Sequence, residues 1–87
     1  MYQQSSEEID VTEIDFRDLN PAQRYTRVFQ IVGDLRAGES FVLVNNHDPK
    51  PLYDQLQAEH PGAFSWTYLV EGPSVWKVEI AIQSKVA

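Results

Sequence analysis

The sequence contains no cysteine. This absence excludes disulfide bonds, thiolate metal ligands and cysteine nucleophiles, and it permits a reducing compartment without requiring one. The chain also lacks any apolar run close to the roughly 18 residues that a membrane-spanning helix needs. Its opening stretch, MYQQSSEE, is polar and acidic, whereas a secretory signal is basic and then apolar. We therefore expect a cytoplasmic protein that does not enter a membrane.

Basic residues are scarce as well. Seven Lys and Arg residues stand against 13 Asp and Glu residues, which gives a formal charge of −6. Such a surface repels nucleic acid and anionic lipid, so we expect neither as a partner. The 87 residues contain no Pro-rich or Gly-rich interruption that would mark a second domain. Residues 1–10 are mostly polar and predict a flexible N-terminal tail, followed by a single domain over residues 11–87.

The first half of the domain predicts a strand and then a helix. Apolar and polar residues alternate over residues 12–17, which is typical of a half-buried strand. The sequence Asn20-Pro21-Ala22-Gln23 predicts a helix start, with Asn20 as N-cap and Gln23 completing a capping box. Gly33 within this helix predicts close packing against a neighbour, and Gly38 is expected to end it. The helix should bury one apolar stripe, made of Tyr25, Val28, Phe29, Val32 and Leu35. It should expose a basic face, a candidate docking surface for an acidic partner, made of Arg24, Arg27 and Arg36.

The second half predicts a strand, a helix and a hairpin. Residues 41–44 form a short apolar run, which favours a central strand covered on both faces. A second helix should begin at Pro49 or Pro51 and end by His60. Residues 64–70 and 76–82 alternate as two strands, with Val70 on the inner face and a turn at residues 71–74 between them. The predicted fold is α+β, a two-layer α/β sandwich in the order βαβαββ, with a four-stranded mixed sheet and two helices on one of its faces.

Candidate functional residues gather between the central strand and the second helix. The segment Asn45-Asn46-His47-Asp48-Pro49-Lys50-Pro51 places an imidazole, a carboxylate and an ammonium group in a short turn. A strand that leads through such a turn into a helix presents polar groups at one edge of a sheet, where small ligands commonly bind. We predict that this region binds a ligand or a partner through Asn45, Asn46, His47, Asp48, Lys50 and Tyr53. We assign no catalytic residue and expect no cofactor.

Other interpretations of these residues remain open. Asp48 could cap the second helix while His47 bonds to the backbone of the turn. His47 could instead act as a general base oriented by Asp48, or as a metal ligand, although zinc sites use three or four protein ligands. His60, at a helix end, is expected to be structural. The aromatic residues of the hairpin are expected to pack in the core; they are Trp66, Tyr68 and Trp76.

Several short motifs carry a resemblance to known families. Over roughly residues 12–82 the chain resembles the TusA/SirA-like family of small sulfur-carrier proteins, through Ile14-Asp15-Phe16-Arg17, Asn20-Pro21, Gly38-Glu39 and Asp48-Pro49. It resembles more closely an uncharacterised bacterial family related to those carriers, through His47-Asp48-Pro49-Lys50-Pro51-Leu52-Tyr53, Phe64-Ser65-Trp66 with Tyr68, Gly72-Pro73 and Val75-Trp76. The resemblance implies the same βαβαββ fold. The carriers work through a Cys-Pro pair at the first helix, and here Asn20 precedes Pro21, so sulfur transfer by that mechanism is excluded.

The resemblance also implies a setting. Relatives are sometimes joined to, or encoded beside, hemerythrin-like and other redox or nitrogen-oxide related proteins. Our leading expectation is a small non-catalytic binding or partner module, monomeric or weakly dimeric, that recognises a protein partner or a small anion. The alternative is a small enzyme or metal-binding protein that uses His47 and Asp48. A third possibility is a structural role in an assembly, through the open face of the sheet at Ser65, Thr67, Lys77 and Glu79.

Overall fold

The computed structural model describes residues 12–83 and contains two helices and four strands. In chain order these are β2 (Thr12–Asp15), α1 (Pro21–Asp34), β3 (Ser40–Asn45), α2 (Lys50–Glu59), β4 (Phe64–Glu71) and β5 (Trp76–Ile82). The predicted order βαβαββ is confirmed. The predicted tail, residues 1–10, lies outside the described residues.

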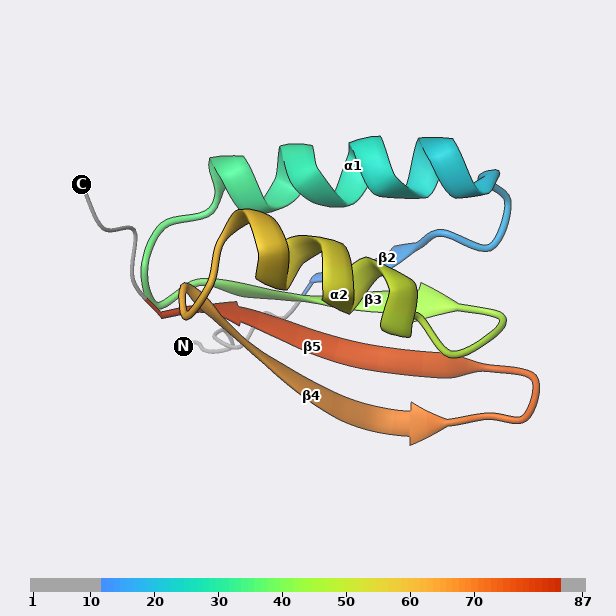
Figure 1. Ribbon diagram of the computed structural model, residues 1–87. Coiled ribbons are helices and arrows are strands. Elements are labelled where there is room, and N and C mark those ends of the chain that lie inside the picture. The colour runs from blue at the N-terminus through green and yellow to red at the C-terminus, as the bar shows by residue number, and fades with distance from the viewer. Residues whose placement is uncertain (1–11, 84–87) are drawn as a thin grey trace, which may run out of the picture.

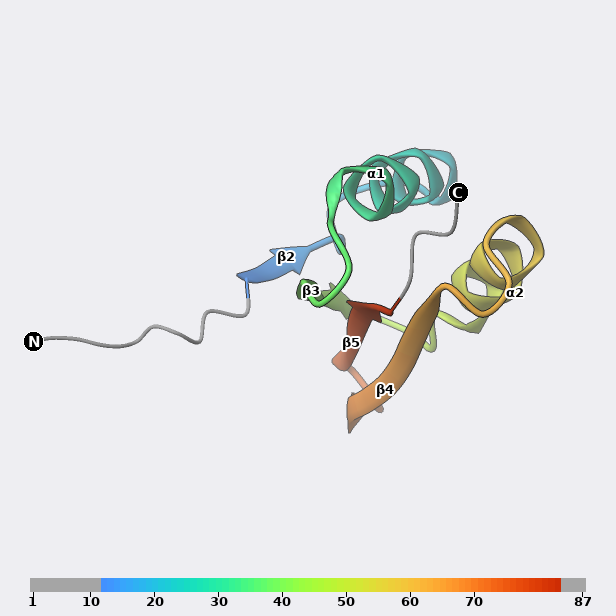
Figure 2. The ribbon, with the colours of Figure 1, turned by 90° about the vertical axis from the view of Figure 1, so that its left-hand side faces the viewer.

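The strands form one mixed sheet in the order β2-β3-β5-β4. β2 runs parallel to β3, whereas β5 is antiparallel to both β3 and β4. Both helices cover the same face of this sheet (Figures 1 and 2), so the predicted two-layer α+β sandwich is confirmed. Within residues 12–83 neither helix is long and apolar enough to cross a bilayer.

Helix α1 begins as predicted and ends earlier than predicted. The Asn20 side chain accepts from the Gln23 N–H, and the Gln23 side chain accepts from the Asn20 N–H, each at 2.9 Å. The expectation that Gly38 ends the helix is wrong, because Leu35 already adopts an extended conformation with φ −77° and ψ 149°. The chain then turns, and the Glu39 carboxylate accepts from the Arg36 N–H at 2.7 Å. Gly38, with φ +92°, therefore shapes this turn and not the helix end.

Gly33 lies in the last turn of α1 and is exposed. The expectation of close packing is wrong, because a Cβ at this position would meet no atom within 4 Å. Replacing Gly33 with alanine should therefore raise the free energy of unfolding by about 0.5–1 kcal/mol, since alanine restricts the unfolded chain and favours helix. Urea unfolding measures this. A lower midpoint would mean that the glycine is needed for a contact.

The core lies between the helices and the sheet. Phe41 and Leu43 of β3 face the helices beside Ile80 and Val78 of β5, their register partners. Val42 and Val44 point to the other face of the sheet and are only 4% and 5% exposed. The prediction of a central strand covered on both faces is thereby confirmed. The remaining fully or nearly buried core residues are Phe16, Val28, Val32, Leu52, Leu56, Phe64 and Ile82.

The hairpin forms as predicted, with two local differences. Its turn is Gly72–Val75, one residue later than expected, because Glu71 still pairs with Trp76. Gly72 has φ +60°, and a Cβ there would lie 2.8 Å from the Trp76 ring, so glycine is required. A bulge between Tyr68 and Val70 shifts the register, so Val70 pairs with Lys77 on the open face. The expected inward position of Val70 is therefore wrong, and its side chain is 39% exposed.

Candidate functional site

Arg24 is the most buried charged residue in the described part of the chain, with 8% of its surface exposed. It lies one helical turn before Val28 and two turns before Val32, so it belongs to the buried stripe of α1. The expectation that Arg24 faces water is therefore wrong, whereas Arg27 and Arg36 are exposed as predicted.

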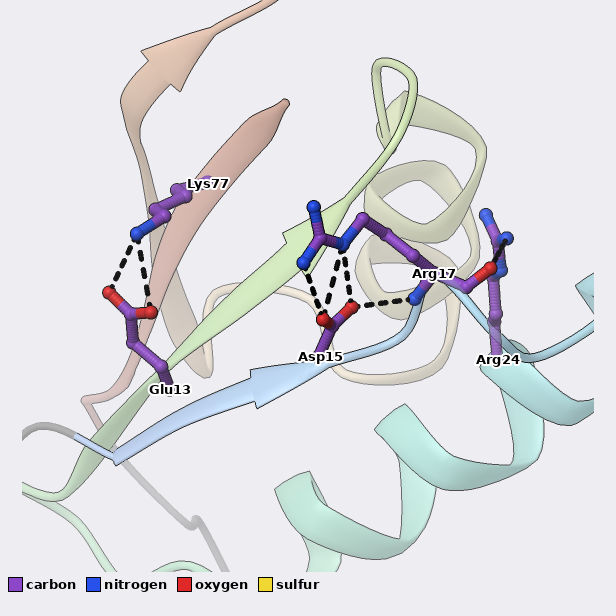
Figure 3. A network of polar contacts seen from close by, with 5 residues as sticks. All are labelled: Glu13, Asp15, Arg17, Arg24 and Lys77. Carbon is purple, nitrogen blue, oxygen red and sulfur yellow. Dashed lines mark hydrogen bonds and ion pairs between the residues drawn. The ribbon is translucent and has the colours of Figure 1, made fainter. Parts of the chain in front are cut away.

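The Arg24 guanidinium joins two loops that are far apart in the sequence. Its Nε donates to the Leu19 carbonyl at 2.7 Å, and its Nη2 donates to the Arg17 carbonyl at 3.2 Å. Figure 3 shows this second contact, with the Arg17 side chain turned away toward Asp15. On the other side, Nη1 contacts three consecutive side chains of the turn after β3: Asn45 Oδ1 at 2.5 Å, Asn46 Oδ1 at 3.3 Å and His47 Nε2 at 3.2 Å.

These contacts indicate which ring nitrogen of His47 carries the proton. A guanidinium can only donate, so His47 Nε2 accepts from Arg24. The other ring nitrogen, Nδ1, lies 3.2 Å from the Asp48 carbonyl and donates to it. A neutral imidazole with its proton on Nδ1 satisfies both contacts, and a metal ligated by this ring would displace one of them. Among residues 12–83 there is no group of three His, Cys, Asp or Glu side chains placed to hold a metal ion.

The Asp48 carboxylate is directed away from the imidazole. Its Oδ1 accepts from the Tyr68 hydroxyl at 2.7 Å and from the Lys50 N–H at 3.1 Å. Burial, together with this bond to Asp48, raises the pKa of the Tyr68 hydroxyl. Asp48 lies one residue before the N-cap of α2, which is Pro49, and the helix begins at Lys50, between the two positions that the sequence left open. The geometry does not join His47 to the Asp48 carboxylate as a base and its orienting group.

Lys50 and Tyr53 lie in a separate hollow between α2 and β4. This hollow has a volume of about 320 Å³ and is also lined by Gln57, Phe64, Trp66 and Tyr68. Lys50 Nζ is 3.0 Å from the Asp54 carboxylate and 5.7 Å from the centre of the Tyr53 ring. The ring of Trp66 makes edge contacts with Tyr53 and Tyr68, so these half-buried aromatics brace one another. The six predicted site residues therefore form two groups, one around Arg24 and one around Tyr68.

The group around Arg24 borders a pocket between the start of α1 and the turn that leads into α2. Its volume is about 260 Å³, and its lining residues are Pro21, Arg24, Tyr25, Asn45, His47, Pro49, Pro51 and Leu52. Asn45 is only 1% exposed. Since its Oδ1 faces Arg24, its amide nitrogen points elsewhere, and that nitrogen has no acceptor among the described residues. Buried polar groups are normally paired, so this enclosed amide nitrogen is an exception beside the pocket.

Arg24 differs from the other cations of the described residues in being buried without an ion pair. The guanidinium groups of Arg27 and Arg36 also have no carboxylate partner there, but they are exposed to water. Arg17 pairs with Asp15, Lys50 with Asp54, and Lys77 with Glu13. Figure 3 shows the first and third of these pairs together with Arg24. Arg24 has no carboxylate oxygen within 4 Å among residues 12–83, and all its acceptors there are neutral. The pocket therefore contains a buried positive charge that the described residues leave uncompensated.

The Asp15–Arg17 pair yields a prediction about pH. Hydrogen bonds from the side chain and backbone of Arg17 lower the pKa of Asp15 from 3.8 to about 2. A lowered pKa means that this carboxylate contributes stability above its unfolded pKa and loses that contribution as the pH falls toward 2. A carboxyl NMR titration should place the Asp15 pKa near 2, and Arg17→Gln should return it toward 3.8. An unchanged value in Arg17→Gln would exclude this cause.

Comparison with protein families matches residues 13–82 to the family described as "Uncharacterized conserved protein (DUF2249)". The chain belongs to this family. The match extends from β2 to β5 and so includes Arg24, the turn after β3 and every lining residue of the pocket. No curated protein and no solved structure shows a significant match. The DUF2249 assignment thus names the family, and the family description states no ligand or activity.

Proposed function

We propose that this domain is a non-catalytic binding module for a small anion, with the pocket at Arg24 as its site. In this proposal the module works in the cytoplasm on a scaffold like that of the TusA/SirA-like sulfur carriers, without their cysteine. The resemblance to those carriers adds a redox or nitrogen-oxide related setting. The observation that carries the proposal is the uncompensated charge of Arg24.

A buried charge is costly unless it is paired, because low-dielectric surroundings solvate it poorly. The carbonyls of Arg17 and Leu19 and the side chains of the turn satisfy hydrogen bonds of Arg24, but they are neutral. They position the guanidinium but do not compensate its positive charge. In a chain of formal charge −6, the described partners of Arg24 include no carboxylate. An anion entering the pocket would supply the missing charge.

The size of the pocket favours a small anion over a protein partner. Its volume of about 260 Å³ lies just below the range of about 300–1,000 Å³ that is typical of small-molecule sites. A protein would have to reach Arg24 with a single side chain. The enzyme alternative finds less support, since His47 accepts from Arg24 and Asp48 accepts from Tyr68. The two groups are therefore engaged separately.

Anion titrations of the ¹⁵N-labelled full chain test the proposal. We expect acetate, added at constant ionic strength, to cause saturable shifts of the backbone amides of Asn45, Asn46, His47 and Leu52. Arg24→Gln should abolish saturation, whereas Arg27→Gln removes the same charge from the exposed face of α1 and should retain it. Shifts that never saturate, or that persist unchanged in a folded Arg24→Gln variant, would refute the anion site.

A further inference from the structure

The hydrogen bonds that Arg24 already makes limit what an incoming group can accept from it. Arg24 has five N–H bonds. Nε uses its one on Leu19, and the two on Nη1 are shared among three side chains. Nη2 uses one on Arg17, which leaves one N–H of Nη2 without an acceptor among the described residues. The unpaired amide nitrogen of Asn45 is fully enclosed, so Arg24 is the donor that an incoming group can use.

The charge of Arg24 suits a carboxylate better than a phosphate. A carboxylate has two oxygens and one negative charge, and one of its oxygens can accept from the remaining N–H of Arg24. Its single charge equals the single uncompensated charge of Arg24. A phosphate ester carries nearly two charges and three oxygens at neutral pH, and binding it would leave both charge and acceptors unmatched.

The rest of the pocket is apolar. Its walls are Pro21, Tyr25, Pro49, Pro51 and Leu52. At about 30 Å³ per water molecule, a volume of about 260 Å³ equals about eight or nine waters, which is more than a bare carboxylate fills. Apolar walls in contact with water lack the favourable free energy that contact with an apolar ligand would provide. Small-molecule sites commonly combine such walls with a few polar groups that fix orientation.

We propose that the ligand is a monocarboxylate with a short apolar body. The carboxylate accepts from the remaining N–H of Arg24 Nη2, and the apolar body packs against Tyr25, Leu52 and the prolines. This inference rests on the proposed anion-binding function and narrows it to a substrate class.

Calorimetric titrations of the full chain with four probes test this inference. The probes are acetate, hexanoate, hexanamide and inorganic phosphate, each at pH 7 and constant ionic strength. Hexanoate should bind at least about tenfold more tightly than acetate, because its additional methylene groups become buried. Hexanamide keeps the chain but lacks the charge, and it should bind at least about tenfold more weakly than hexanoate. Phosphate should bind more weakly than hexanoate.

Two variants of the apolar wall provide the control. Tyr25→Ala should weaken hexanoate binding several-fold more than it weakens acetate binding, whereas Tyr25→Phe should retain the affinity for hexanoate. If acetate or phosphate bound as tightly as hexanoate, the proposed substrate class would be wrong while the anion site stood. If hexanamide bound as tightly as hexanoate, an apolar pocket without an anion site would explain the result. Binding of none of the four probes would overturn both proposals.

Discussion

Replacing Arg24 with glutamine should lower the free energy of unfolding by about 3 kcal/mol. The guanidinium pairs the carbonyls of Arg17 and Leu19 and the side-chain oxygen of Asn45. Each buried acceptor left unpaired costs about 1–3 kcal/mol. Removal of an uncompensated buried charge offsets part of this loss, so the expected value is below the sum. Denaturant unfolding followed by tryptophan fluorescence measures it.

The matched control is Arg27→Gln, three residues later on the exposed side of the same helix. This variant should change the free energy of unfolding by no more than about 0.5 kcal/mol, as is usual for surface substitutions. If Arg24→Gln were as mild as Arg27→Gln, the contacts of Arg24 would not hold the two loops together, and its burial would be incidental.

Local signals in the sequence predicted the beginnings of elements well. The cap of α1 needs only Asn20, Pro21 and Gln23, which are adjacent, so its geometry is encoded locally. The period of two along β4 correctly directed Phe64, Trp66 and Tyr68 to the helix side. Element ends were harder to predict. The end of α1 depends on Leu35 turning the chain and on a side-chain bond between Glu39 and Arg36 that no pattern announces.

The bulge in β4 illustrates a second limit. It accompanies the pairing of Glu71 with Trp76 across the hairpin and the close approach of the Trp76 ring to Gly72. Both are relations between strands, and a pattern along one strand does not contain them. The alternation therefore failed after Tyr68 and misplaced Val70.

Arg24, the main residue of the pocket, was not predicted as a site residue, because its charge favoured an exposed position over the buried position that its spacing indicated. Arginine is rarely buried, and Arg24 was therefore assigned to water. Its spacing gave the correct answer, since positions 24, 28 and 32 share one face of a helix and the latter two are valines. The turn at residues 45–50 was located correctly. The sequence did not predict that some side chains of this turn contact Arg24 and others contact Tyr68, because these contacts join residues that are 21 and 20 positions apart.

Replacing Asn45 with aspartate should weaken acetate binding at least about tenfold while the protein stays folded. Aspartate has nearly the same shape, and one of its oxygens can accept from Arg24 as the asparagine oxygen does. The second oxygen replaces the amide nitrogen that has no acceptor in the described structure, so the residue beside Arg24 gains a negative charge. Two unit charges 4 Å apart interact by about 4 kcal/mol at an effective dielectric constant of 20, and each 1.4 kcal/mol is about tenfold in affinity. The side-chain carboxylate introduced at position 45 thus competes with acetate for the charge of Arg24.

Stability separates this effect from unfolding. The charge-assisted bond between Asp and Arg24 should keep the free energy of unfolding within about 1 kcal/mol of the unsubstituted protein at pH 7, because it offsets the desolvation of the new carboxylate. Gln30→Glu, on the exposed side of α1, makes the same change in net charge and should leave acetate binding intact. If Asn45→Asp and Gln30→Glu bound acetate equally well, the charge of Arg24 would already be balanced in the unsubstituted protein. The pocket would then have no need of an anion.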